Sequence, residues 1–251
     1  MKEEKIPKII HLCWLSNEAY PPKILECINS WRQIMPDYEI MLWNEEKFKE
    51  IDNVFAKEAF AARKWAFVAD YIRLYALYTY GGIYLDSDVK VYKRFDSFLN
   101  HSFFSCIEYF KPTNYIAIEA AVLGSVSGHP FVLECLEEYK SLRFIKGDGI
   151  FDFTTITVRM AQVAKKWGFQ FKPEMQCLKD DIFIYPPVTF TNPSGEFSLQ
   201  KTYAIHLCTG SWVEGKPRLL ERVISFTKFY IDKPGLALGN LFRKIKSRWL
   251  R

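Results

Sequence analysis

Two aspartates separated by a single residue offer the clearest chemistry in this sequence. Asp86 and Asp88 flank Ser87 and follow the short apolar run Ile83–Leu85. Side chains at positions i and i+2 of an extended chain point to the same side, so these two carboxylates could share one divalent cation. Mn²⁺ and Mg²⁺ prefer such oxygen ligands and would bind the phosphates of a nucleotide diphosphate. Taken alone, the tripeptide is better explained as a solvated turn.

The residues before the two aspartates place them at the end of a buried strand. Apolar residues recur with a period near 3.6 over Glu58–Tyr80, which predicts one long helix. Gly81 and Gly82 would end that helix, and Ile83–Leu85 would follow as a strand. Because open α/β sheets bind ligands at the carboxyl ends of their strands, this position favours a ligand site over a surface turn.

A charged pair lies on the predicted long helix. Asp70 and Arg73 are one turn apart, among apolar residues that include Val68 and Ile72. A surface ion pair would contribute little to stability, whereas a charged pair inside a mostly apolar helix needs a reason to be there. The residue pattern leaves ligand binding and surface pairing equally open.

Further candidates lie in the first and last predicted strands. His11 and Trp14 belong to the first strand, where a tryptophan could stack on a nucleotide base; core packing is the favoured alternative for both. His206 lies in the last strand, and Trp212 follows it after a glycine-containing turn. His206 could supply a third metal ligand or could be a core histidine, and the pattern supports both equally.

The order of the remaining elements predicts an α/β fold. A strand, a helix and a second strand open the chain, and this order indicates a parallel unit. The expected strands are Ile6–Leu15, Tyr38–Trp43, Ile83–Leu85, Val89–Tyr92, Phe103–Glu108, Ala120–Gly124 and Tyr203–Leu207, the last of them in the core. The expected helices are Lys23–Met35, Glu58–Tyr80, Pro130–Leu142 and Ile156–Trp167.

Three separated segments together resemble the family 32 glycosyltransferases with a DXD sugar-binding region. They are IPKIIHLCW from Ile6, KWAFVADYIRLYALYTYGGIYLDSDV from Lys64 and YAIHLCTGSW from Tyr203. This family includes bacterial capsular-polysaccharide transferases and Golgi mannosyltransferases. The resemblance implies a GT-A fold, which is a Rossmann-like nucleotide-binding domain with a central mixed β-sheet flanked by helices. It also implies a nucleotide-diphosphate sugar donor, Mn²⁺ or Mg²⁺, and retention of anomeric configuration.

The resemblance further implies roles for individual residues. Trp14 matches the position that stacks on the base, and Tyr84 matches a tyrosine that contacts the donor. Asp70 and Arg73 match positions that hold the donor sugar and phosphates. The predicted catalytic residues are Asp86, Asp88 and Arg73; the predicted nucleotide-sugar contacts are Trp14, His11, Asp70, Arg73, Tyr84, Asp86, Ser87 and Trp212; the predicted metal ligands are Asp86, Asp88 and His206.

The acceptor side of the reaction is less defined, because residues 109–200 resemble the family only loosely. We expect this region to bind the acceptor. Glu119, Asp148 and Asp152 are candidates for a nucleophile by residue type, although solvated loop acids are the better explanation for each. A retaining enzyme could also react without a carboxylate nucleophile.

The charge of the chain is concentrated at its end. The net charge is +5, and residues 216–251 contain ten basic and two acidic residues. We therefore predict a domain over residues 1–215 and a basic extension over residues 216–251, and we expect no nucleic-acid partner. Within the extension, Leu236–Arg251 has the pattern of an amphipathic helix that contacts an anionic membrane surface. A terminal helix docked on its own domain explains this pattern equally well.

The cysteines and apolar runs indicate the cellular compartment in which we expect the protein. Six cysteines occur without a CxxC pair, so buried reduced thiols are favoured over disulfides. No apolar run approaches the roughly 20 residues that span a bilayer, and the charged N-terminus does not resemble a signal peptide. We expect a cytoplasmic protein with peripheral contact at the cytoplasmic face of the membrane.

These observations predict a retaining, metal-dependent hexosyltransferase of surface-polysaccharide biosynthesis, such as that of a capsule. The donor would be a UDP-sugar in preference to GDP-mannose, and the acceptor a glycan or lipid-linked glycan. One alternative is a metal-dependent DxD phosphohydrolase, although that loop usually carries Thr or Val where Lys90 lies. Two others are a toxin-like protein glycosyltransferase and a binding module without catalysis.

Overall fold

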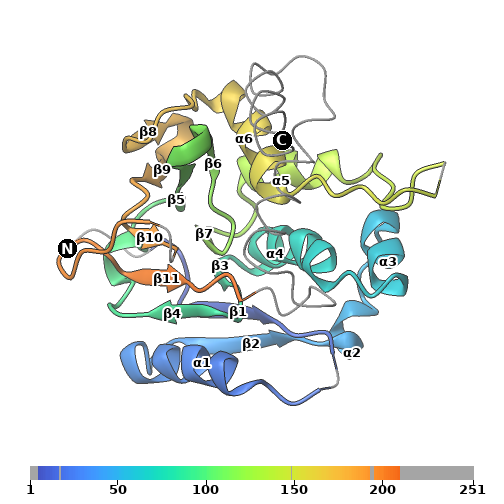
Figure 1. Ribbon diagram of the computed structural model, residues 1–251, viewed down its shortest axis with the longest axis horizontal. Helices are drawn as coiled ribbons and strands as arrows, with labels where there is room; N and C mark the ends of the chain where they lie inside the picture. The colour runs from blue at the N-terminus through green and yellow to red at the C-terminus, as the bar shows by residue number, and fades with distance from the viewer. Residues whose placement is uncertain (1–4, 17, 148, 193–194, 210–251) are drawn as a thin grey trace, which may run out of the picture. The chain divides into compact units, whose positions relative to one another are not determined.

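The chain folds around a mixed β-sheet in the part that the computed structural model describes, residues 5–16, 18–147, 149–192 and 195–209 (Figure 1). The strands are β1 (Ile9–Cys13), β2 (Glu39–Trp43), β3 (Gly82–Leu85), β4 (Val89–Val91), β5 (Phe103–Phe110), β6 (Tyr115–Ile118), β7 (Val122–Ser125), β8 (Gln176–Leu178), β9 (Ile182–Tyr185), β10 (Phe190–Thr191) and β11 (Ala204–His206). The helices are α1 (Pro22–Ile34), α2 (Glu45–Phe48), α3 (Val54–Ala61), α4 (Trp65–Tyr80), α5 (Pro130–Glu138) and α6 (Ile156–Ala164).

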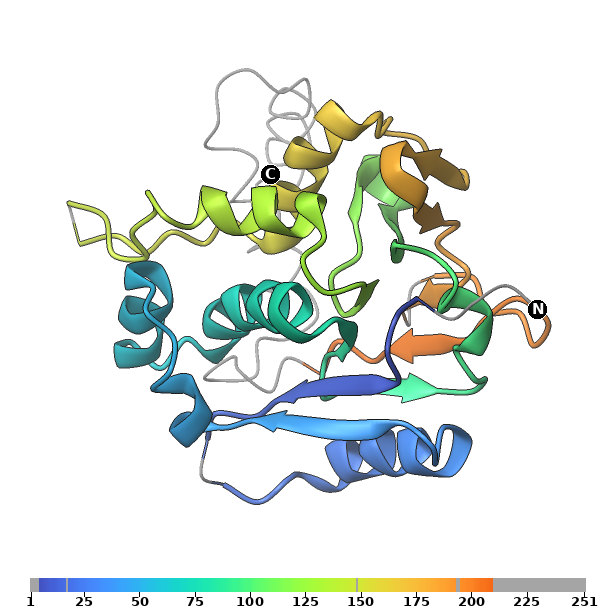
Figure 2. The ribbon, with the colours of Figure 1, turned by 180° about the vertical axis from the view of Figure 1, so that it is seen from behind.

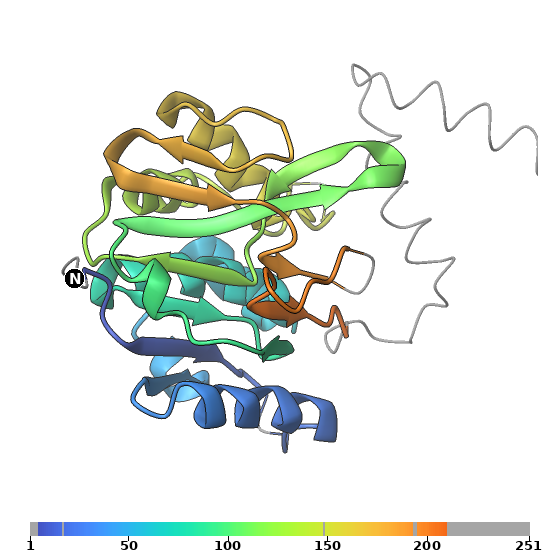
Figure 3. The same cartoon turned by 90° about the vertical axis from the view of Figure 1, so that its left-hand side faces the viewer.

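The larger sheet has the strand order β2-β1-β3-β7-β5-β9-β8, with β6 added to β5. β1 is parallel to both β2 and β3, whereas β7 runs antiparallel to its neighbours β3 and β5. Figure 3 shows β5 and β6 as a long hairpin in green. The predicted α/β fold with a central mixed sheet flanked by helices is therefore confirmed.

Both faces of this sheet are covered, which explains the continuous apolar runs of its central strands. Successive side chains of a strand point to opposite faces, so Ile83 and Leu85 pack in one core and Tyr84 in the other. Helices α1 and α4 lie on opposite sides of β1 and β2 (Figure 2). The strand that ends at the two aspartates is thus held from both sides.

The predicted single helix over Glu58–Tyr80 is wrong, because the chain forms two helices there, α3 and α4. The break lies at Arg63, which has φ +55°. The amide of Arg63 donates to the Phe60 carbonyl, and the amide of Lys64 donates to the Ala59 carbonyl. This pair of bonds is the Schellman ending of a helix. It was missed in the sequence because an arginine occupies the left-handed position where glycine is usual.

The last predicted strand, Tyr203–Leu207, forms as β11, and its Ala204 is buried in the core as expected. It does not join the larger sheet, because it pairs with β10 and β4 in a separate three-stranded sheet. Its antiparallel register sets His206 opposite Val89, and the amide of Leu207 donates to the Asp88 carbonyl. This small sheet therefore brings the end of the described chain close to Asp86 and Asp88, because β4 directly follows Asp88.

The predicted boundary at residues 215 and 216, and the segment Leu236–Arg251, lie outside the described residues. The described residues through Thr209 form one compact unit. Among the described residues, no helix has both the length and the apolar character to cross a membrane. All six cysteines are free thiols, of which Cys27, Cys106 and Cys135 are buried and Cys177 and Cys208 are exposed.

The turn from α4 into β3 depends on two glycines, as predicted. Gly81 has φ +67° and its amide donates to the Leu77 carbonyl, which ends the helix. Gly82 has φ +103°, and a Cβ atom there would lie 2.6 Å from the Ile9 carbonyl oxygen. The backbone of Ile9 can neither move away nor rotate easily, because it lies at the start of β1.

We expect Gly82→Ala to destabilise the protein by about 3 kcal/mol, because it combines a left-handed backbone with a steric clash against the main chain. Gly128→Ala is the matched control. Gly128 also has positive φ, but a Cβ atom there would meet no atom within 4 Å, so its cost should be only about 1 kcal/mol. Urea unfolding of the three proteins measures both values. Equal stability of the two variants would contradict the role of Ile9.

Candidate metal centre

Three side chains from two distant parts of the chain converge beyond the end of β3. Asp86, Asp88 and His206 each offer one ligand atom, and these atoms lie within 4.8 Å of one another. The Nε2 atom of His206 lies 3.4 Å from Asp88 Oδ1 and 3.9 Å from Asp86 Oδ2. Two carboxylates and one imidazole are ligands that suit Mn²⁺, so the residues present fit the predicted metal.

The loop after β11 holds Asp88 in its charged form. Asp88 Oδ2 accepts hydrogen bonds from the amide of Thr209 at 2.8 Å and from its hydroxyl at 2.9 Å. Burial raises the pKa of Asp88, but the hydrogen bonds from His206 and Thr209 outweigh burial and lower the pKa to about 2. Burial disfavours the charged form of His206 and by itself lowers its pKa. The contacts of His206 with Asp88, Cys208 and Glu119 outweigh burial and hold this pKa well above the usual value.

Asp86 is held by contacts on its other side. Its Oδ1 atom accepts a hydrogen bond from the Tyr84 hydroxyl at 2.8 Å and lies 3.4 Å from Arg73 Nη2. Its backbone amide donates to the Ala121 carbonyl at 2.9 Å. These contacts leave Oδ2 directed toward His206, so Asp86 can accept a cation without giving up its support.

Arg73 and Asp70 are buried, with only 4% and 7% of their surface exposed. Arg73 Nη2 lies 3.0 Å from Asp70 Oδ1, and Arg73 Nη1 donates to the Ala120 carbonyl at 2.6 Å. Asp70 Oδ2 accepts from the amide of Ile156, at the start of α6. Burial raises the pKa of Asp70 to about 6. The sequence-based alternative of a surface ion pair is therefore wrong, and contact of these residues with a donor stays a prediction.

Tyr84 contacts both Asp86 and Arg73. Its ring is 1% exposed and lies under the Arg73 guanidinium, 4.6 Å from the ring centre. Burial raises the pKa of its hydroxyl well above the usual value, so the group remains a neutral donor to Asp86. The structure places Tyr84 where it orients the Asp86 carboxylate, and its predicted contact with the donor stays untested.

The two candidates in β1 have different surroundings. His11 is fully buried; its Nδ1 atom accepts from Trp43 Nε1, and its Nε2 atom lies 2.7 Å from the Gly81 carbonyl. Burial lowers its pKa to about 4. Core packing, the favoured alternative, therefore describes His11. Trp14 is half-buried after β1, packs against Tyr20 and remains a candidate for base stacking.

The remaining predicted residues divide into buried and undescribed ones. Glu119 is 5% exposed and Asp152 is 7% exposed, so their interpretation as solvated loop acids is wrong. Asp152 is instead paired with Arg159, at 2.9 Å. Asp148 and Trp212 lie outside the described residues. Ser87 lies in the turn between the two aspartates and is partly buried.

Sequence reasoning missed two residues of this region. Thr209 lies inside the YAIHLCTGSW segment, but only the fold shows that it binds Asp88. Glu108 lies on β5 opposite Ala117 of β6, two residues before Glu119. Burial and the Glu119 charge raise the pKa of Glu108 to about 8, which keeps this carboxyl group neutral at pH 7. In the sequence, Glu108 could have been noticed as an acidic residue within the aromatic and apolar segment that forms β5.

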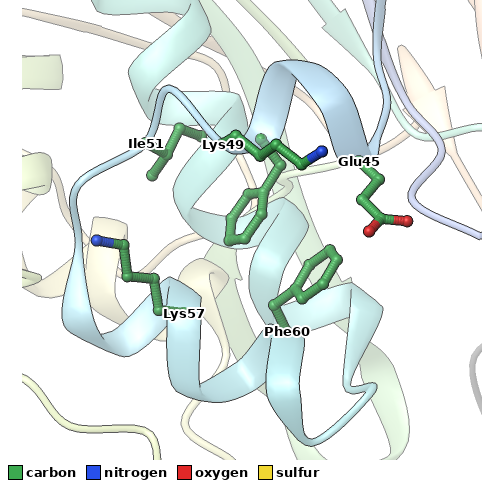
Figure 4. A pocket seen from close by; sticks show the side chains of 6 residues that line it. Glu45, Lys49, Ile51, Lys57 and Phe60 are labelled. Carbon is green, nitrogen blue, oxygen red and sulfur yellow. The ribbon is translucent and has the colours of Figure 1, made fainter.

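A surface hollow elsewhere does not share this chemistry. It is formed by α2, α3 and the residues between them (Figure 4). Its lining residues are Glu45, Phe48, Lys49, Ile51, Lys57 and Phe60. None of the predicted site residues is among them, and Phe48 stacks on Phe60 with ring centres 4.5 Å apart. The acids of the metal centre therefore define the candidate site.

Comparison with known families agrees with this geometry. Residues 21–105 match the family described as "Glycosyltransferase sugar-binding region containing DXD motif". Residues 21–105 are therefore similar to this DXD sugar-binding region. The matched residues run from the start of α1 into β5 and include both Asp70 and Arg73 as well as Asp86 and Asp88. The resemblance predicted from the three segments is thus confirmed for the DXD region.

Relatives of this chain include two yeast proteins whose names refer to mannosylated inositol phosphoceramides. Inositol phosphoceramide mannosyltransferase 3 of Schizosaccharomyces pombe is 33% identical over 143 residues, covering 55% of this chain and 38% of that protein. Mannosyl phosphorylinositol ceramide synthase SUR1 of Saccharomyces cerevisiae is 31% identical over 143 residues, covering 55% and 36%. The chain thus spans less than half the length of these relatives.

Solved glycosyltransferase structures are more distant. The PaToxG glycosyltransferase has a TM-score of 0.47 and 18% identity, covering 65% of this chain and 70% of that chain. The galactosyltransferase LgtC, in complex with donor and acceptor sugar analogs, has a TM-score of 0.45 and 14% identity, covering 90% and 98%.

We expect Arg73→Met to destabilise the protein by about 3 to 5 kcal/mol, because it leaves the buried Asp70 and the partly buried Asp86 without their cation. Arg94→Met is the matched control. Arg94 also pairs with two acids, Asp37 and Asp96, but its side chain is 39% exposed, so its loss should cost at most about 1 kcal/mol. Chemical unfolding measures both variants. Similar losses in the two variants would contradict the importance of burial.

We expect Mn²⁺ to bind more tightly as the pH rises from 6 to 8. A proton on His206 Nε2 competes with the cation, and the raised pKa of His206 keeps that proton bound at neutral pH. Titration calorimetry in buffers of different ionisation enthalpy measures both affinity and proton release. His206→Gln is the control and should bind weakly with little dependence on pH. A wild-type affinity that is constant over this range would contradict the assignment.

Proposed function

We propose that this protein is a metal-dependent glycosyltransferase that moves a hexose from a nucleotide-diphosphate sugar to a glycan or a lipid-linked glycan. One observation carries the proposal. Asp86, Asp88 and His206 converge at the carboxyl end of β3, inside and beside a segment that matches the DXD sugar-binding region. The proposal includes a GT-A domain and retention of anomeric configuration, both of which the family resemblance implies.

The roles of the site residues follow from their contacts. Asp86, Asp88 and His206 would hold Mn²⁺ or Mg²⁺, which when bound neutralises charge on the leaving nucleoside diphosphate. Asp88 supplies a permanent negative charge, since its pKa is about 2. Tyr84 and Arg73 hold Asp86 in place through its Oδ1 atom. Trp14 stacks on the nucleotide base, and Ser87 contributes to donor binding.

The relatives' names suggest which donor and acceptor to test first. They name mannose as the transferred sugar and an inositol phosphoceramide as the acceptor, so GDP-mannose and inositol phospholipids join the UDP-sugars and polysaccharide acceptors expected from the sequence. A protein acceptor is the remaining alternative. We propose that the reaction occurs at the cytoplasmic face of a membrane, with contact through Leu236–Arg251.

The competing phosphohydrolase function predicts a different product. A hydrolase of the DxD class would transfer the phosphoryl group of a simple ester to an aspartate and then to water. A glycosyltransferase leaves both phosphates on the nucleotide and transfers only the sugar. The match of residues 21–105 to a sugar-binding region favours the second outcome.

We expect slow release of GDP or UDP from one sugar donor in the presence of Mn²⁺, faster once the acceptor is added. EDTA should abolish the release, and Asp88→Asn should lower it at least 100-fold, because removing a charged ligand withdraws support from the leaving diphosphate. A luminescent nucleotide assay measures the release with GDP-mannose and UDP-hexoses. Glycan, inositol phospholipid and protein acceptors are compared as separate reactions.

Asp52→Asn, which changes an exposed acid next to Lys57, is the control and should retain full activity. Nuclear magnetic resonance of the first product identifies the anomer and thereby tests retention. Turnover that needs no metal, or full activity of Asp88→Asn, would contradict the proposal. Release of inorganic phosphate from simple esters would favour the hydrolase.

A further inference from the structure

Residues 119–121 connect β6 to β7, which both pair antiparallel with β5, and we call this segment the corner. Three separate elements are bonded to it. The Arg73 guanidinium of α4 donates to the Ala120 carbonyl, and the Asp86 amide donates to the Ala121 carbonyl. From β5, the Ser105 hydroxyl donates to the Glu119 carbonyl at 2.6 Å. The corner is therefore a rigid part of the protein that adjoins the metal centre.

The side chain of Glu119 turns back onto the corner and toward β11. Its Oε1 atom accepts hydrogen bonds from the amides of Ala120 at 3.0 Å and Ala121 at 2.8 Å. The same oxygen lies 3.5 Å from the Nδ1 atom of His206. Because the carboxylate is held by two backbone amides, its position relative to the histidine ring is set by the main chain.

This places a different acid on each side of the His206 ring. Nδ1 faces Glu119, whereas Nε2 faces Asp88 and Asp86. Only an unprotonated ring nitrogen can bind a cation, so the nitrogen that keeps the proton decides which edge of the ring is the ligand. A carboxylate beside one nitrogen holds the proton there and orients the ring.

We propose that Glu119 is a positioning residue that holds the Nδ1 proton of His206 and so directs Nε2 to the cation shared with Asp86 and Asp88. This inference rests on the metal centre of the proposed function. It assigns Glu119 no contact with the sugar. Its burial and its bonds to two amides also argue against the nucleophile role for which its residue type made it a candidate.

The corner thereby supports two of the three ligands at once. It holds the backbone of Asp86 through the Ala121 carbonyl and the ring of His206 through Glu119. These two ligands are 120 positions apart in the chain, so their spacing cannot come from local structure. A change at Glu119 should therefore affect metal affinity without removing a ligand.

Calorimetric titration with Mn²⁺ alone tests this inference. Glu119→Ala should weaken binding 10- to 100-fold, the usual effect of removing a partner of a ligand histidine. Glu119→Gln keeps an oxygen for Nδ1–H but loses the charge, so it should weaken binding at least threefold and less than Glu119→Ala. Thermal unfolding without metal verifies that each variant is folded.

Glu108→Gln is the matched control. Glu108 is a neighbouring acid on β5, but its raised pKa keeps it neutral at pH 7, so the substitution changes neither shape nor charge greatly. Its affinity for Mn²⁺ should stay within twofold of the wild type. An equal loss in Glu108→Gln and Glu119→Gln would overturn the specific role of Glu119.

A second measurement separates positioning from a general effect on packing. The chain has four histidines, so ¹⁵N spectra of the Zn²⁺-loaded protein resolve them, with His206→Gln as the assignment variant. We expect coordination through Nε2 and a slowly exchanging, downfield Nδ1–H. In Glu119→Gln that proton should move upfield and exchange faster. Coordination through Nδ1 in the wild type, or an unchanged proton in Glu119→Gln, would overturn the inference.

The two proposals fail in different ways. If wild-type protein and Glu119→Ala bind Mn²⁺ and Zn²⁺ equally well, Glu119 has no positioning role but the metal centre stands. If the wild type binds neither cation at His206, the metal centre itself fails and the inference on Glu119 fails with it.

Discussion

The site depends on one buried cation, the guanidinium of Arg73. Taking such a group out of water costs several kcal/mol unless charged and polar partners surround it. Its partners are Asp70, Asp86 and the Ala120 carbonyl, with Tyr84 stacked against its face. Each partner belongs to a different part of the fold, so satisfying this one charge requires α4, β3 and the turn before β7 to come together.

This requirement explains why the proposed metal ligands meet where they do. Asp86 is tied to Arg73, and Asp88 follows two residues later at the edge of the small sheet. β4 then pairs antiparallel with β11, which returns His206 to the same place. The backbone and hydroxyl of Thr209 complete the support of Asp88. A site of few residues is thus built from contacts spread over more than a hundred positions.

The errors of sequence reasoning have specific physical causes. Arg63 ends α3 in a left-handed conformation that glycine normally signals, so two helices were taken for one. Glu119 was interpreted as a solvated acid because nothing in its neighbours shows that two amides and His206 surround it. His11, predicted to contact the nucleotide sugar although core packing was the favoured alternative, is buried with both ring nitrogens in contact with protein groups.

What the sequence determined by itself was local: the DXD tripeptide after a buried strand, the Gly81 and Gly82 turn and the α/β class, because periodicity and turn chemistry are set by near neighbours. The tertiary structure decided which groups face one another. Only pairing between β4 and β11 brings His206 to Asp86 and Asp88. Hydrogen bonds from His206 and Thr209 keep Asp88 charged in spite of its burial, whereas burial and the Glu119 charge raise the pKa of Glu108. Charge states and distances across the fold depend on neighbours that are remote in sequence, so they cannot be derived from local patterns.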